Sequence, residues 1–299
     1  MSHEVESRCY KSSVPWFPPE IKYKTAQLGL LDKNTTKLYK PTSKAGDSES
    51  DVDELYHWQW CHVWWEMVQN YCSSDLSEER DKLVAFSGIA KQFQKMSGYT
   101  YLAGLWLEDI CRHLLWKPYK GNIHVRRPRN WRAPSWSWAS LDGEVFYNYA
   151  TWIRERVENM ITVKAVRIQP VADDAMGELC AAAIDIECRI HRLALLPGEK
   201  SGNLTLDREG NHIHLRFNSL YGTDDDLGRE LNLKAGPGST ENLCMPVIQD
   251  RYRIYLLLLK QNDDGTYERI TCWVAWPPIG TDLQDFHWNA LPLSIITLV

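Results

Sequence analysis

Asp109 and His113 are the residues whose types and spacing come nearest to a catalytic pair. Four positions apart, they would share one face of a helix. Burial there could shift the pKa of the imidazole and make it a general base. The sequence places no nucleophile beside them. A hydrolase site built on this pair, near the face of Trp136 and Trp138, and a hydrogen-bonded helical pair without chemistry are therefore both open interpretations.

Three other patterns were tested as ligand sites. His212 and His214 would project from one face of a strand, as two zinc ligands do, but no third ligand is identifiable. Residues 262–265 (NDDG) approach a calcium loop, yet Lys260 stands where the first Asp is required, so a hairpin turn is predicted. Residues 198–201 (GEKS) lack the spacing of a phosphate loop. The sequence predicts neither a metal nor a cofactor.

A basic and aromatic segment precedes the middle of the chain, and it could meet phosphate or RNA bases. The net charge of −5 and the pI of about 6.0 argue against nucleic acid as a partner. The alternative is a solvated loop, or arginines that stack on nearby indoles. The residues concerned are Arg126, Arg127, Arg129, Trp131 and Arg132.

Length and composition limit the class of protein. The 299 residues allow one large or two ordinary domains, and a hydrophobic content of 44% is enough for a sizeable core. No run approaches the roughly 20 apolar residues of a membrane span, so no membrane partner is expected. Residues 1–13 lack the apolar stretch of a secretory signal, and the eight cysteines are scattered without a Cys-x-x-Cys pair. This indicates reduced thiols in a cytoplasmic protein.

Three helices are predicted in the first half of the chain, after a polar linker over residues 40–54. The first runs from Tyr56 to Cys72 and has an apolar face that covers about half its circumference. The second precedes Gly98, which reads as its C-terminal stop, and the third spans Tyr101–Trp116. Part of the wide face of the first helix is a candidate partner or self-association surface, formed by Trp60, Trp64, Met67 and Tyr71.

The segment 132–147 (RAPSWSWASLDGEVFY) joins the helical half to a strand-rich half. Trp136 and Trp138 alternate with small residues, which predicts a strand with both indoles on one face. Asp142-Gly143 predicts a hairpin turn, and residues 145–147 a return strand. Further strands are predicted at residues 161–168, 179–196, 203–206, 212–217, 252–259 and 266–276, with a loop over 223–240.

These elements predict an α+β protein, in which an N-terminal helical segment is followed by an antiparallel β-sandwich or barrel-like region. The expected organisation is an extended or linker segment over residues 1–51, a helical region over 52–133 and a β-region over 134–299. Small-ligand binding inside a β-barrel lined by tryptophans is a further alternative function.

Residues 56–146 resemble the region downstream of the HET domain in fungal heterokaryon-incompatibility proteins. The string SWSWAS-x-DG within Ala133–Gly143 is the most specific match. The resemblance implies that the matching positions are family motifs with a structural role. They include Asp81, Gly88, Trp106, Trp116, Pro134, Trp136, Trp138, Asp142 and Gly143.

In that family the HET domain itself precedes this region, and its YxWG-like and VDxxCIxQ-like motifs are absent from this sequence. The resemblance therefore implies a truncated or repurposed relative from a fungal non-self recognition and cell-death lineage. The function expected from it is a non-enzymatic interaction or regulatory module that binds a protein partner or a second copy of itself.

Overall fold

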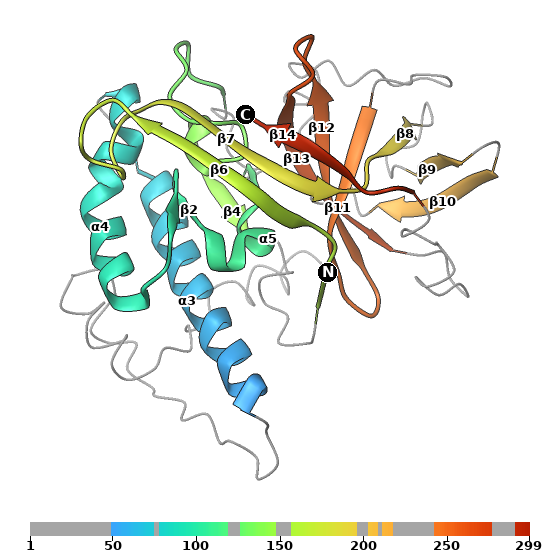
Figure 1. Cartoon of the computed structure of the whole chain (residues 1–299), viewed down its shortest axis with the longest axis horizontal. Helices are drawn as coiled ribbons and strands as arrows, with labels where there is room; N and C mark the ends of the chain where they lie inside the picture. Colours follow the sequence, from blue (N-terminus) through green and yellow to red (C-terminus); the bar gives the residue numbers. More distant parts are fainter. Residues whose placement is uncertain are drawn as a thin grey trace, which may run out of the picture. The chain divides into compact units, whose positions relative to one another are not determined.

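The computed structural model describes residues 49–74, 78–118, 126–147, 157–195, 203–208, 211–217, 242–276 and 291–299. The chain divides into two compact units, Met1–Asn70 and Tyr71–Val299. The predicted boundaries at residues 51/52 and 133/134 stay predictions. Within the described parts, the protein is α+β, with few helices and a large mixed sheet (Figure 1).

The first unit contributes most of helix α3, Glu49–Cys72. The helix starts seven residues before the predicted Tyr56, so the end of the predicted linker is helical; residues 40–48 lie outside the described part. Trp64 and Met67 are buried, whereas Trp60 and Tyr71 are partly exposed. These four side chains therefore do not form one continuous exposed patch, and their role in partner binding stays a prediction.

Helix α4, Lys82–Ser97, matches the second predicted helix and follows a short 3₁₀ turn, Glu79–Asp81. It ends at Gly98, which has φ +75° and donates its backbone N–H to Gln94 O at 2.8 Å. Glycine tolerates this left-handed conformation, which explains the stop. The buried face of the helix is apolar except for Lys82, and its other members are Leu83, Phe86, Ala90 and Phe93.

The helix predicted over Tyr101–Trp116 is wrong. Strands β1 (Tyr101–Leu102) and β2 (Leu105–Trp106) form a hairpin instead, and only α5 (Ile110–His113) is α-helical, after a 3₁₀ turn at Leu107–Asp109. Ala103 and Gly104 have positive φ, at 45° and 96°, as both central residues of a tight hairpin turn require. Turn geometry at these two residues thus overrides the helical periodicity.

The main sheet of the second unit has ten described strands in the order β10-β9-β8-β11-β12-β13-β14-β7-β6, with β5 paired to β11. Its ladders are antiparallel except for β13 and β14, which meet in parallel at Tyr267 and Leu298. Strand β10 also pairs with β13 through Arg216–Trp276 and Phe217–Ala275. The strand bounds are β5 Glu158–Asn159, β6 Thr162–Pro170, β7 Leu179–Cys188, β8 His191–Leu195, β9 Asn203–Arg208, β10 Asn211–Phe217, β11 Asn242–Gln249, β12 Ile254–Gln261, β13 Tyr267–Trp276 and β14 Ser294–Leu298.

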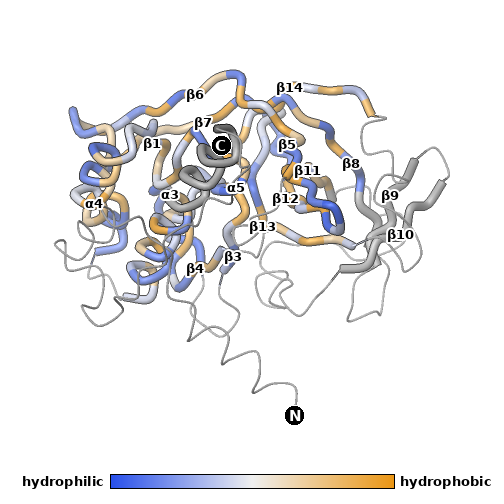
Figure 2. Tube along the Cα trace, turned by 90° about the horizontal axis from the view of Figure 1, so that it is seen from below, coloured by the Kyte–Doolittle hydropathy of each residue, from blue (hydrophilic) through white to orange (hydrophobic). Residues whose placement is uncertain are grey.

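Strand burial differs along the sheet. In β12 the six residues Ile254–Leu259 are all buried, so both of its faces are covered. Strand β6 mixes hydrophobic residues with Lys164 and Arg167 and has no buried residue; among the described strands it pairs only with β7 and ends the strand order (Figure 2). All the strands predicted after residue 160 are present, although the run 179–196 is interrupted between β7 and β8. Strands β11 and β14 were not predicted from the sequence.

Two predicted features follow from these elements. Residues 262–265 form the expected hairpin turn, with Asn262 N bonded to Thr266 O at 2.9 Å and Gly265 at φ +82°. The stretches 198–201 and 223–240 lie outside the described residues. None of the helices that the structure describes is long and apolar enough to cross a membrane.

Candidate functional site

The segment Arg132–Leu141 is buried and folds into turns, not into the predicted strand. Ser137 N bonds to Pro134 O at 2.9 Å, and a 3₁₀ helix, Trp138–Ser140, follows. Ser137 caps that helix by accepting from Ala139 N at 3.1 Å. Because Pro134 favours a turn and Ser137 favours a helix start, local hydrogen bonding replaces the period of two. The predicted return strand does exist as β4 (Val145–Tyr147), but it pairs with β3 (Trp116–Pro118).

The two indoles are fully buried and hold separate parts of the unit together. Trp138 donates its Nε1 hydrogen to Gly104 O at 2.7 Å and meets Phe86 edge to face at 5.5 Å. A Cβ at Gly104 would lie 2.7 Å from that Nε1, so only glycine fits there. Trp136 accepts a hydrogen bond at its backbone carbonyl from Trp116 Nε1 at 2.9 Å.

The serines of the same segment bond to backbone groups. Ser135 Oγ accepts from Arg269 N at 2.8 Å, and Ser135 N donates to Val299 O at 2.9 Å. Ser137 Oγ donates to Ala103 O at 2.5 Å. Each hydroxyl therefore satisfies a buried main-chain group, which is a structural role. The motif that carries the family resemblance is a junction between the β1–β2 turn, strand β13 and the end of β14.

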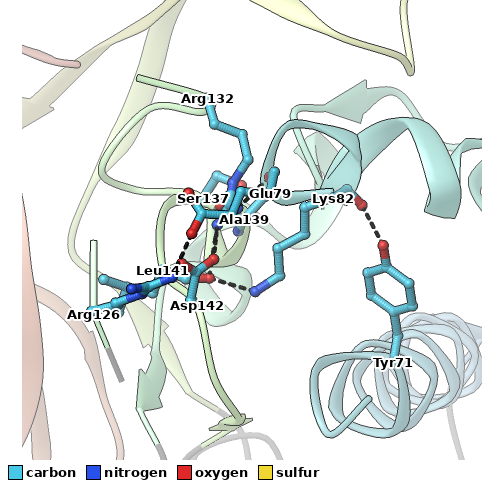
Figure 3. A network of polar contacts seen from close by, with 9 residues as sticks. All are labelled: Tyr71, Glu79, Lys82, Arg126, Arg132, Ser137, Ala139, Leu141 and Asp142. Atoms are coloured by element: carbon cyan, nitrogen blue, oxygen red, sulfur yellow. Dashed lines mark hydrogen bonds and ion pairs between the residues drawn. The ribbon is translucent and has the colours of Figure 1, made fainter. Parts of the chain in front are cut away.

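A first buried cation cluster lies beside this junction (Figure 3). Arg132, 5% exposed, donates to Ala139 O at 2.7 Å and to Leu141 O at 3.1 Å. It also forms an ion pair with Asp142 at 2.9 Å. Its remaining donor bonds to Glu79 O at 2.5 Å. All its partners are backbone carbonyls or one carboxylate, so the guanidinium fixes the segment against the start of α4.

Lys82 is the second cation of this cluster and is 2% exposed. Its ammonium donates to Leu141 O and lies 5.7 Å from the centre of the Trp138 ring. Burial lowers the pKa of Lys82. Tyr71 closes the group from the end of α3, since its hydroxyl donates to Lys82 O at 2.9 Å (Figure 3).

A second buried cation cluster centres on Arg269 in β13. Its guanidinium is fully buried, stacks on the Trp116 ring at 3.8 Å and donates through Nε to Leu114 O at 3.1 Å. Nη2 donates to Trp116 O. Burial lowers the pKa of Arg269 to about 10. Lys117, 4% exposed, follows Trp116 in β3, and burial lowers its pKa too.

Asp109 and His113 do not form an accessible catalytic pair. Asp109 accepts from Arg112 at 3.0 Å, and the ring of His113 meets Tyr147 edge to face at 6.5 Å. His113 is fully buried, which lowers its pKa to about 3. An imidazole with so low a pKa is a weak base at pH 7. Because Trp136 and Trp138 are also sealed in the interior, they offer no substrate face beside it.

The other family-motif positions have varied environments. Trp106 is buried and stacks on Phe93 with ring centres 4.9 Å apart. Gly88 lies on the exposed side of α4, and Asp81 is exposed at the start of that helix. Asp142 pairs with the arginines, and Gly143 has φ +91°.

The predicted basic segment does not act as one surface. Arg132 is buried, Arg127 donates to Arg269 O at 3.1 Å, and Arg126 pairs with Glu79 and with Asp142. Trp131 remains 51% exposed. No group of three or more metal-binding side chains occurs among the residues that the structure describes. His212 and His214 lie in β10, whose side chains are outside that description.

Sequence reasoning missed the roles of Lys82, Lys117 and Arg269. The available signal was a cation at the end of an apolar run, as Arg269 directly before residues 270–276 (ITCWVAW). No family model matches this sequence, and no curated protein or solved structure matches it either.

Proposed function

We propose that the chain is a non-enzymatic, cytoplasmic protein-binding module, related to the region downstream of the HET domain in fungal heterokaryon-incompatibility proteins. The observation that supports it is the burial of every residue from Arg132 to Leu141, where the Arg132 guanidinium and the Ser135 and Ser137 hydroxyls bond to the protein's own backbone. A motif with this environment maintains the fold. The partner would then bind to exposed residues outside this motif.

The surface that we favour is the outer side of the start of β14. Ile295 in β14 is 62% exposed, and Leu293, one residue before the strand, is 50% exposed. Ile296 and Leu298, on the opposite side, are buried. Two exposed aliphatic side chains at the start of β14 could serve as a small apolar anchor of a protein interface.

Charged pairs surround this apolar centre on the neighbouring strands. Ile295 pairs in register with Glu187, which forms an ion pair with Lys164 at 2.8 Å. Asp185, two residues earlier, binds Arg167 and accepts from Thr297 at 2.8 Å. An apolar centre with a polar rim is the usual anatomy of a transient protein interface.

The partner class that we propose is a HET-domain protein, because a HET domain accompanies this region in the family that residues 56–146 resemble. The test is co-purification from a fungal lysate with quantitative mass spectrometry. Tagged wild-type chain is compared with the double variant Leu293→Lys/Ile295→Lys. HET-domain proteins are expected with the wild type and are expected to be depleted at least ~10-fold with the variant, as a loss of about 1.4 kcal/mol predicts.

The matched control is Val171→Lys, which changes another exposed aliphatic side chain, 56% exposed, between β6 and β7. It should retain the HET-domain proteins. Equal recovery by all three chains refutes the proposed surface. Absence of HET-domain proteins from the wild-type sample refutes the proposed partner.

A second candidate function rests on the strand order. The path β10-β9-β8-β11-β12-β13 returns to β10 through the β10–β13 pairs, which supports a barrel-like closure and, with it, binding of a small apolar ligand. Saturable binding of one equivalent of an apolar fluorescent dye to the folded chain would support this candidate. Fluorescence that rises without saturation would exclude it.

A further inference from the structure

Strand β14 is held unequally along its two edges. On one side it pairs antiparallel with β7 along its whole length. On the other side, among the described residues, it meets β13 in parallel at a single pair, Tyr267 with Leu298, and Val299 N donates to Tyr267 O at 2.9 Å. The contact with β13 is therefore confined to the end of β14 that lies away from the exposed Ile295.

The Ser135 hydroxyl lies where the next bond of this parallel ladder is expected. Bonds in a parallel pair are evenly spaced, so after the bond from Val299 N to Tyr267 O the next one would run from Arg269 N to Val299 O. In this protein Arg269 N donates instead to Ser135 Oγ at 2.8 Å, and Ser135 Oγ donates to Val299 O. The hydroxyl is thus inserted between the two strands and bonds to both.

Two further contacts fix the same junction. Ser135 N donates to Val299 O at 2.9 Å, so this oxygen accepts from both the backbone and the hydroxyl of Ser135. Arg127 donates to Arg269 O at 3.1 Å, so a side chain also occupies the following acceptor of β13. Side chains from the segment before β4 therefore continue the ladder in place of a longer strand.

Burial makes the Ser135 hydroxyl hard to replace. Ser135 is 4% exposed and Arg269 is 0% exposed, so solvent does not reach the bond between them. Without the hydroxyl, the Arg269 N–H would lose its acceptor, and an unpaired buried donor is destabilising. This destabilisation would fall on the junction of β13 and β14.

Ser137, two residues later, has a different role. Its hydroxyl donates to Ala103 O at 2.5 Å and accepts from Ala139 N at 3.1 Å, so both bonds lie outside β14. The two serines of the buried motif therefore anchor different parts of the unit. Ser137 anchors the β1–β2 turn, and Ser135 anchors the end of β14.

The position of β14 in the sheet determines where Ile295 points. Ile296 and Leu298 are 5% and 0% exposed, whereas Ile295 is 62% exposed. Neighbouring residues of a strand project to opposite faces. The burial of Ile296 and Leu298 therefore directs Ile295 outward only while β14 stays in the sheet.

We propose that Ser135 is a positioning residue for the partner surface: its hydroxyl and N–H hold the end of β14 against β13, and this keeps Ile295 in the orientation that a partner binds. The inference rests on the proposed function, whose partner surface lies at the start of the same strand. The buried motif then acts on the surface through the backbone of β14.

Hydrogen exchange of the full chain, measured by mass spectrometry, tests the hold on β14 without a partner. Peptides over residues 294–299 report on β14, and peptides over Lys82–Ser97 report on α4. In the wild type, exchange in 294–299 should be at least ~10-fold slower than in unstructured chain. Ser135→Ala should speed it at least ~5-fold relative to α4, as the loss of one or two hydrogen bonds predicts. Ser137→Ala, the matched control, should leave this ratio unchanged.

Calorimetry with a HET-domain protein from the co-purification tests the positioning role. Ser135→Ala changes no exposed residue, yet it should weaken the Kd at least ~5-fold if a loosened β14 no longer presents Ile295. Ser137→Ala should keep the wild-type Kd. If Ser135→Ala does not fold, Ser135→Cys, whose thiol is a weaker hydrogen-bonding group, allows the same comparisons.

Exchange and binding separate a failure of this inference from a failure of the proposed function. Wild-type exchange in 294–299 as fast as in unstructured chain, or equal rates there in Ser135→Ala and Ser137→Ala, would overturn the inference. So would an unchanged Kd in a Ser135→Ala chain whose β14 exchanges faster. A wild-type chain that binds no HET-domain protein would refute the proposed function and with it the positioning role, while the exchange data would still decide whether Ser135 holds β14.

Discussion

Replacing Gly104 by alanine should destabilise the protein, because this glycine meets two separate demands. Its φ of +96° is unfavourable for a residue with a Cβ and costs about 1–2 kcal/mol. The new Cβ would also lie 2.7 Å from Trp138 Nε1, and overpacking of this kind costs about 1–3 kcal/mol. Together they give a loss of roughly 2–5 kcal/mol in the free energy of unfolding.

The matched control for this change is Gly88→Ala. Gly88 lies within α4, and a Cβ there would meet nothing within 4 Å. Alanine should therefore stabilise the helix by up to about 1 kcal/mol. Both substitutions reduce the backbone entropy of the unfolded chain by a similar amount. The difference between their free energies of unfolding therefore reports on the folded structure around residue 104. Urea unfolding measures both, and equal midpoints for the two variants would refute the packing argument at Trp138.

Three further predictions concern buried side chains. Trp136→Ala should lower the free energy of unfolding by about 3–5 kcal/mol, and a Tm within a degree of wild type would show that this ring is not core. For His113 the folded pKa, about 3, lies below its ordinary value of 6.5, so the unfolded chain takes up the proton first and stability falls as pH drops through that window. His113→Gln should flatten this pH dependence in urea unfolding, and an unchanged slope would contradict it. Lys82→Met should stay within about 1 kcal/mol of wild type because Leu141 O keeps its bond from Arg132, whereas Arg132→Met should cost about 3–5 kcal/mol. The reverse order of the two midpoints would contradict the roles given to these cations.

The sequence predicted correctly the elements that are determined by residues close together in the chain. Helix α4 was found because its apolar spacing and its glycine stop agree. The helix over Tyr101–Trp116 was wrong because the backbone at Ala103 and Gly104 adopts positive φ, which a hydrophobic period does not reveal. The strand predicted from the alternation at residues 135–139 was wrong for a related reason, since Ser137 bonds to nearby backbone and bends the segment.

The interior polar contacts could not be predicted from spacing. Arg269 bonds to carbonyls more than 150 positions earlier in the chain, and Arg132 bonds to Glu79 O across 53 positions. Such contacts depend on tertiary packing. A sequence can only indicate that a cation at the end of an apolar run needs a partner if it is buried, as in β13.

The measurement that tests the proposed function most directly is the affinity of this chain for a purified HET-domain protein from the co-purification. Isothermal titration calorimetry would compare the wild type with Ile295→Lys and with the control Val171→Lys. We expect saturable binding by the wild type and the control, and a Kd at least ~10-fold weaker for Ile295→Lys. An unchanged Kd for Ile295→Lys, or no heat of binding with the wild type, would contradict the account.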